Sequence, residues 1–122
     1  MPAGVGIMTG ETGGAAGTTD NLSGAPNVTI GQNGFDQGMA ELGNIIRHEI
    51  NHAVQYQENG NIKGDQDRYM REIGAHRYNI AHPIPGTPQT NLQTRQKWID
   101  GYYNQLSPDN KAAVDSGVYH GK

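Results

Sequence analysis

The longest helical pattern in this chain is DQGMAELGNIIRHEINHAVQYQENG, residues 36–60, and the rest of the fold is expected to form around it. Asp36 is a residue type that often caps helix N-termini, and Asn59-Gly60 is a common helix end. The sequence therefore predicts a helix from about Gln37 to Glu58. Its apolar residues recur at helical spacing and predict a buried stripe: Met39, Leu42, Ile46, Ile50 and Ala53. The residues on its far side are predicted to face solvent: Asn44, Arg47, Asn51, Gln55 and Glu58.

This helix carries two histidines four residues apart, His48 and His52. Residues with this spacing lie about 40° apart around a helix axis, so both rings can reach one metal ion. Glu49 follows the first histidine and is placed to act on water at that ion. The pattern His-Glu-x-x-His is typical of zinc peptidases, in which the glutamate is the general base. In projection the histidines lie beside Ile45, on a flank that we expect to form the wall of a cleft.

A catalytic zinc takes three protein ligands and keeps one position open. The third ligand is expected to be Glu72, on the inward-looking face of the next predicted helix. A short turn between the two helices would bring them side by side. His76, one helical turn after Glu72, is a competing ligand or a partner that orients one.

The residues His48-Glu49-x-x-His52, followed by Glu72, resemble the gluzincins, the thermolysin-like clan of zinc metallopeptidases. The resemblance implies that Zn²⁺ is the cofactor, that the two histidines and Glu72 bind it, and that Glu49 is the catalytic base. In that clan an aspartate stands four residues after the third ligand and supports the first histidine. This chain has His76 at that position, so the supporting role there is open.

The clan also has a substrate-binding edge strand ahead of the active-site helix. The residues in the corresponding place here are Val28, Thr29 and Ile30. Small domains with this arrangement resemble the metallopeptidase toxin domains of bacterial polymorphic toxins and secreted effectors. That resemblance implies a peptide or protein substrate, a cognate immunity protein, and secretion or delivery into the cytoplasm or periplasm of a target cell.

The sequence predicts a mainly helical α+β fold, in the form of a minimal zincin-like domain. A short strand or hairpin is expected before the active-site helix, and two or three further helices after it. Residues 1–26 are rich in glycine and predict a strand at Val5–Met8 with a long loop from Thr9 to Pro26, or else a linker. Residues 27–122 are expected to form the metallopeptidase domain, beginning with a β-branched strand at Asn27–Ile30.

Three further helices follow from the pattern of apolar and capping residues. One is expected from about Asp67, capped by Asp65, to about His82, where a proline follows. The next is marked by apolar residues, with an aromatic residue alongside in the core: Leu92, Ile99, Tyr102 and Leu106, with Trp98. Ser107-Pro108 predicts an N-cap and the first turn of a short last helix that ends near Asp115.

Composition limits the classes of partner. The chain has 122 residues, which suits one domain, and a net charge of −3 without a cluster of basic residues. Nucleic acid and anionic membranes are therefore not expected partners. The chain is also expected to be a monomer. The absence of cysteine excludes cysteine zinc sites and disulfides. No apolar run has transmembrane length, and the N-terminus lacks the pattern of a signal peptide, so delivery would need another carrier.

Three functional hypotheses follow from the motif. The first is a zinc endopeptidase that acts as a delivered toxin. The second is a zinc hydrolase that cleaves cell-wall peptides. The third is a non-catalytic module in which zinc joins two helices. Glu49 argues against the third hypothesis, because a structural zinc site needs no base. The sequence leaves the choice between the first two open.

Overall fold

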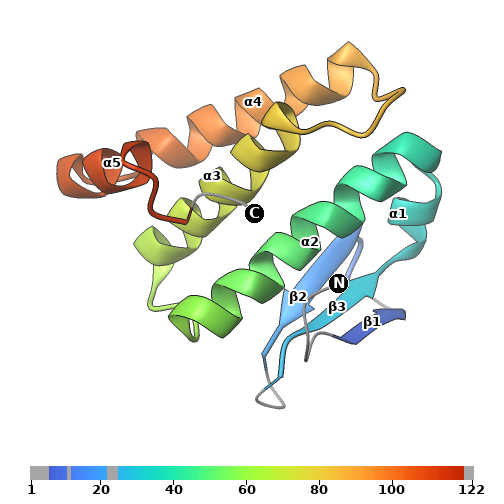
Figure 1. Cartoon of the computed structure of the whole chain (residues 1–122), viewed down its shortest axis with the longest axis horizontal. Helices are drawn as coiled ribbons and strands as arrows, with labels where there is room; N and C mark the ends of the chain where they lie inside the picture. Colours follow the sequence, from blue (N-terminus) through green and yellow to red (C-terminus); the bar gives the residue numbers. More distant parts are fainter. Residues whose placement is uncertain (1–5, 11, 22–24, 120–122) are drawn as a thin grey trace. The chain divides into compact units, whose positions relative to one another are not determined.

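The computed structural model describes residues 6–10, 12–21 and 25–119. The fold is α+β and mainly helical, which confirms the predicted fold class (Figure 1). The chain divides into two compact units. The first unit is Met1–Asn61 with Ile84–Gly86, and the second unit is Ile62–Pro83 with Thr87–Lys122.

The first unit contains a sheet of short strands, β1 (Gly6–Thr9), β2 (Gly17–Asp20) and β3 (Asn27–Ile30). β3 lies in the middle, with β1 parallel on one side and β2 antiparallel on the other. The predicted strand Asn27–Ile30 is therefore confirmed. The predicted loop from Thr9 to Pro26 is wrong where β2 forms, because β-branched threonines at the centre of this stretch pair with β3.

Two helices complete the first unit, the short α1 (Gln32–Phe35) and the long α2 (Met39–Asn59). Gly60 ends α2 with a φ of 76°, as its position predicts. Asp36 does not cap α2. It follows the last residue of α1 and accepts a hydrogen bond from Gln32 Nε2 at 3.0 Å, while α2 begins after Gly38 at a φ of 91°.

α2 packs against β2 and β3, and their shared core explains which of its faces is buried (Figure 1). The buried apolar residues of this core come from β3 and α2: Val28, Ile30, Ile45 and Ala53. Leu42 and Ile46 pack against them, but Met39, at the helix start, is 84% exposed. The predicted solvent face is wrong at three polar residues, which are buried: Asn44, Asn51 and Gln55. Asn44 Oδ1 accepts a hydrogen bond from the backbone N–H of Ile84 at 3.0 Å, so the segment Ile84–Gly86 satisfies this buried amide oxygen.

The second unit is built from α3 (Asp65–Ala81), α4 (Gln89–Asn104) and α5 (Pro108–Asp115). Figure 1 shows α3 and α4 running side by side, and these two helices share the core of the unit. The buried apolar residues come from the three helices and from the connection between α4 and α5: Met70, Ile73, Ile99, Leu106 and Val114.

The structure confirms one of three expectations for the second unit and contradicts the other two. Ser107 caps α5 by accepting a hydrogen bond from the N–H of Asn110 at 3.3 Å, and Pro108 begins the helix, as predicted. Asp65 was expected to cap α3, but it is the first helical residue, and Gly64 precedes it at a φ of 95°. Trp98 was expected in the core, but it is 51% exposed.

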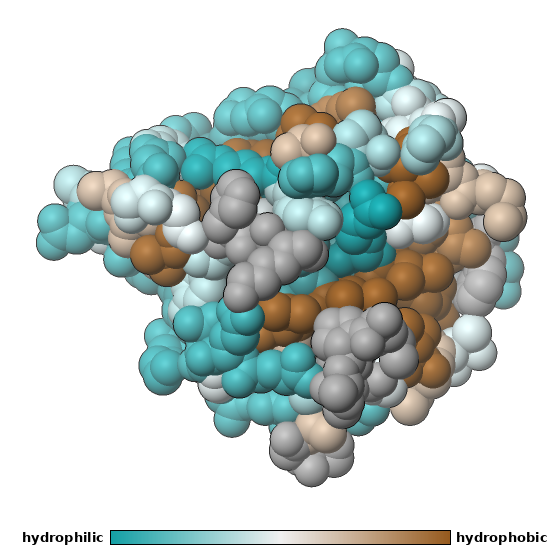
Figure 2. Space-filling model, in the orientation of Figure 1, coloured by the Kyte–Doolittle hydropathy of each residue, from teal (hydrophilic) through white to brown (hydrophobic). Residues whose placement is uncertain are grey.

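The face drawn in Figure 2 carries both hydrophilic and hydrophobic residues, and the hydrophobic ones gather in a band between the hydrophilic ones. The exposed apolar residues include Ile7 and Met8 on β1. Within the described ranges, no helix combines the length and hydropathy that crossing a bilayer requires.

Candidate metal centre

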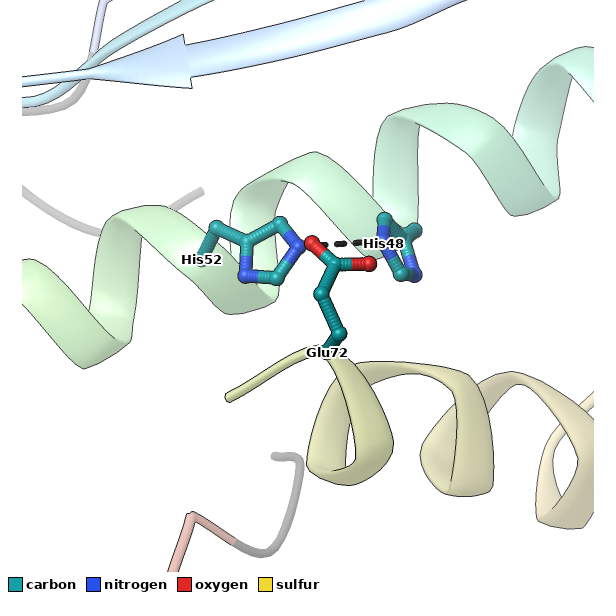
Figure 3. A group of neighbouring side chains, drawn as sticks. All are labelled: His48, His52 and Glu72. Carbon is teal, nitrogen blue, oxygen red and sulfur yellow. Dashed lines mark hydrogen bonds between the residues drawn. The ribbon is translucent and has the colours of Figure 1, made fainter. Parts of the chain in front are cut away.

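The two motif histidines point at each other from successive turns of α2. Their Nε2 atoms are 3.0 Å apart, as the dashed line in Figure 3 marks, and their rings are perpendicular. Two imidazole nitrogens bound at 2.0–2.1 Å to one tetrahedral ion would be about 3.3 Å apart. The pair of His48 and His52 is therefore close to the spacing that two ligands of one zinc ion need.

Gln55 fixes which nitrogen of His52 can bind a metal. Its Oε1 atom is 2.9 Å from His52 Nδ1 and can only accept, so Nδ1 carries the proton and donates it. The lone pair of His52 is then on Nε2, the atom that faces His48. Metal-binding histidines commonly have their other nitrogen held in this way. The sequence pattern placed Gln55 on a solvent face, although its position three residues after a histidine could have suggested this contact.

Glu49 is held by the sheet. It is only 7% exposed, and the hydroxyl of Thr19 on β2 lies 2.8 Å from Glu49 Oε1 and 2.9 Å from the backbone oxygen of the same residue. Gly17 allows this close approach, because a Cβ atom there would lie 3.0 Å from Glu49 Cγ and 3.2 Å from Ile45 Cγ2. Thr19 was not among the predicted site residues, because its segment was expected to be a loop.

Glu72 lies on α3 and has His76 as its neighbour one turn later. His76 Nε2 is 3.3 Å from Glu72 Oε2, and His76 Nδ1 is 3.1 Å from Arg95 Nη1 on α4. Both nitrogens of His76 are thus engaged within the second unit. This arrangement favours His76 as the residue that orients Glu72, one of the two roles that the sequence left open. Arg95 was not predicted, because no sequence motif links it to His76, which lies 19 residues earlier in the chain.

Figure 3 draws His48, His52 and Glu72, each of which could offer one ligand atom to a metal ion. Two imidazole nitrogens and one carboxylate oxygen form a donor set that catalytic zinc uses. The histidines belong to the first unit and Glu72 to the second.

The prediction that Val28, Thr29 and Ile30 form an edge strand is wrong. β3, which carries Val28, Thr29 and Ile30, has a paired strand on both sides. Its backbone hydrogen-bonding groups are therefore not available to an added peptide strand, and Val28 and Ile30 are buried in the core. The strands at the two ends of this sheet are β1 and β2, which come from the glycine-rich segment where only one short strand was expected.

Comparison with known proteins adds no family to this description. No family model matches the sequence, and the searches of curated proteins and of solved structures also found no match. The expected resemblance to gluzincins therefore depends on the sequence alone, namely on the motif His48-Glu49-x-x-His52 and on Glu72.

Proposed function

We propose that this domain is a zinc-dependent peptidase. His48, His52 and Glu72 are the metal ligands, and Glu49 is the general base. The observation that carries the proposal is the histidine pair, whose Nε2 atoms are 3.0 Å apart while Gln55 keeps the lone pair of His52 on that nitrogen. Two rings arranged in this way are suited to binding one ion between them.

The composition of the site favours a catalytic role over a structural one. Structural zinc sites are closed by four protein ligands, whereas catalytic sites have three and leave a position for water or substrate. Among the residues that the structure describes, the candidate group contains three: His48, His52 and Glu72. Glu49 also has a defined hydrogen-bonding partner in Thr19, which a purely structural zinc site would not require.

Glu49 performs the proton transfers in the proposed reaction. Bound zinc supplies Lewis acidity, which allows water to act as a nucleophile near neutral pH. Glu49 accepts a proton as the water oxygen bonds to the scissile carbonyl carbon, and it passes this proton to the amine as the C–N bond breaks. The products are a carboxylate and an amine. The hydroxyl of Thr19 lies 2.8 Å from Oε1, and we assign the proton transfer to the other carboxylate oxygen, Oε2.

The substrate is proposed to bind as an extended peptide along β2, in place of the β3 edge expected from the sequence. β2 is the end strand of the sheet beyond β3, so its outer edge can add a peptide strand. The contact from Thr19 to Glu49 ties this strand to the general base. A peptide on β2 would therefore lie beside the residue that transfers the proton.

The replacement of Glu49 by glutamine is the direct test of this function. Glu49→Gln retains the volume and the acceptor for Thr19 but removes the base. We expect unchanged zinc content and melting temperature, with hydrolysis of a mixed peptide library slower by about 10²- to 10⁴-fold. Glu58→Gln, the same change near the end of α2, is the control and should keep full activity. A Glu49→Gln protein as active as the wild type would contradict the proposal.

We also propose that the domain is the toxic part of a secreted bacterial effector, as the resemblance implies. Expression in the bacterial cytoplasm should stop growth, and Glu49→Gln should abolish the effect. Growth arrest only after export to the periplasm would instead favour cell-wall peptides as the substrate. Arrest that persists in the Glu49→Gln variant would show that the harm is not hydrolytic.

A further inference from the structure

A buried chain of hydrogen bonds within the second unit leads from α4 to Glu72. Arg95 is only 4% exposed, and its Nη1 atom lies 3.1 Å from His76 Nδ1 and 3.2 Å from Asn79 Oδ1. A guanidinium group donates hydrogen bonds and accepts none. The two protons on Nη1 therefore go to these two acceptors, and His76 Nδ1 must carry a lone pair.

This contact determines the tautomer of His76. With its lone pair on Nδ1, the neutral ring carries its proton on Nε2, which lies 3.3 Å from Glu72 Oε2. The direction of donation is then from Arg95 to His76 and from His76 to Glu72. Both ring nitrogens of His76 are used in this chain, which leaves neither of them for a metal.

The aromatic residues around His76 limit its rotation. The ring centroid of Trp98 is 5.3 Å from that of His76, and the ring of Tyr102 is stacked with His76 at 6.5 Å. Asn79, which receives the second proton of Arg95 Nη1, is fully buried on α3. The guanidinium and the imidazole are thus both fixed, and the imidazole presents one N–H group to the carboxylate of Glu72.

We propose that Arg95 is a positioning residue for the metal ligand Glu72 and acts on it through His76. The inference rests on the proposed zinc site, since it assigns a role to Arg95 only if Glu72 is a ligand. Arg95 sets the tautomer of His76, and His76 holds Oε2 of Glu72. The carboxylate is then oriented before the metal binds, so that it loses less conformational freedom on binding.

The test measures Zn²⁺ affinity by chelator competition and, separately, the melting temperature of the metal-free protein. Arg95→Met retains much of the side-chain volume but removes the donor, and it should weaken zinc binding about 10- to 100-fold, as is typical for residues that support a ligand. Arg95→Lys retains a donor and should recover part of the affinity. His76→Leu interrupts the same chain and should match Arg95→Met, which keeps the test informative if one variant does not fold.

A second background separates positioning from general stability. In Glu72→Gln protein, adding Arg95→Met should not weaken zinc binding further, because Arg95 acts only through Glu72. A purely structural Arg95 would produce the same loss in both backgrounds, and that result would overturn the inference. Unchanged zinc affinity in Arg95→Met would also overturn the inference. So would loss of zinc in His76→Leu together with normal zinc binding in Glu72→Gln. The proposed site itself fails on a different result, namely zinc binding that persists in His48→Ala and His52→Ala.

Discussion

The proposed role of Glu49 sets two opposing requirements, since a general base must reach water, yet this side chain is 7% exposed. Burial of a carboxylate without hydrogen bonds is costly. The hydroxyl of Thr19 supplies a hydrogen bond at 2.8 Å, which offsets part of that cost and fixes one oxygen of the carboxylate. β2 therefore holds the carboxylate of Glu49 through Thr19, in addition to α2, which carries the residue.

Removal of this hydroxyl should slow the reaction while leaving the metal in place. Thr19→Val preserves the shape of the side chain but removes the donor. A hydrogen bond to a charged group contributes roughly 1.5–3 kcal/mol, and about 1.4 kcal/mol is worth a factor of ten in rate, so we expect hydrolysis to fall about tenfold or more. Thr18→Val, at the adjacent position of β2, is the control. Equal rates for Thr19→Val and the wild type, measured on one peptide substrate, would rule out this role for Thr19.

At this scale, the sequence predicted the residues whose relation is local. His48, Glu49 and His52 lie within two turns of one helix, so their spacing alone fixes their relative positions. The residues that hold them could not be found in this way. Thr19 is 30 residues away from Glu49, and Arg95 is 19 residues away from His76, so only the tertiary fold shows these contacts.

Among the elements, the helices were predicted better than the sheet. The end of α2 and the start of α5 follow from glycine, serine and proline at positions where the backbone requires them. β2 has only a short run of threonines, and it becomes a strand through pairing with β3. The wrong prediction of a solvent-exposed face on α2 has a similar origin. Buried Asn44 accepts a hydrogen bond from Ile84, which lies 40 residues further along the chain.

Gly74 lies where α3 packs against Tyr119. An alanine Cβ there would overlap the carbonyl oxygen of Tyr119 and lie 2.8 Å from its carbonyl carbon. Alanine is favoured over glycine inside a helix by roughly 1 kcal/mol, but overpacking against backbone costs about 1–3 kcal/mol. Gly74→Ala should therefore reduce the free energy of unfolding, measured with urea, and Tyr119 should be displaced.

The matched control is Gly101 on α4, where an added Cβ meets nothing within 4 Å. Gly101→Ala should raise the free energy of unfolding by roughly 0.5–1 kcal/mol, the usual gain from replacing glycine inside a helix. The two substitutions are chemically identical, so their opposite signs would isolate the contact with Tyr119. If both substitutions stabilise the protein, Tyr119 does not pack against Gly74 in solution.

The three proposed metal ligands belong to different compact units of the chain. The first unit provides a histidine pair whose geometry is set by α2 and Gln55, and the second provides a carboxylate whose geometry is set by His76 and Arg95. Each half is organised by contacts within its own unit. If zinc binds to all three residues as proposed, the stability of each unit would depend on the folding of the other.

Zinc should therefore stabilise the native chain and protect both units together. A ligand that binds only the folded state at a free concentration of one hundred times its Kd adds about 2.7 kcal/mol to the free energy of unfolding. We expect a gain of this size for the wild type at that zinc concentration, with hydrogen exchange slowed in α2 and α3 alike, and reversal by chelation. His48→Ala should show neither effect. Glu72→Ala should retain at most weak protection, confined to α2, because the histidine pair alone can still hold an ion. If zinc slows exchange in wild-type α2 but leaves α3 unchanged, the metal is bound by the first unit alone and Glu72 is not its third ligand.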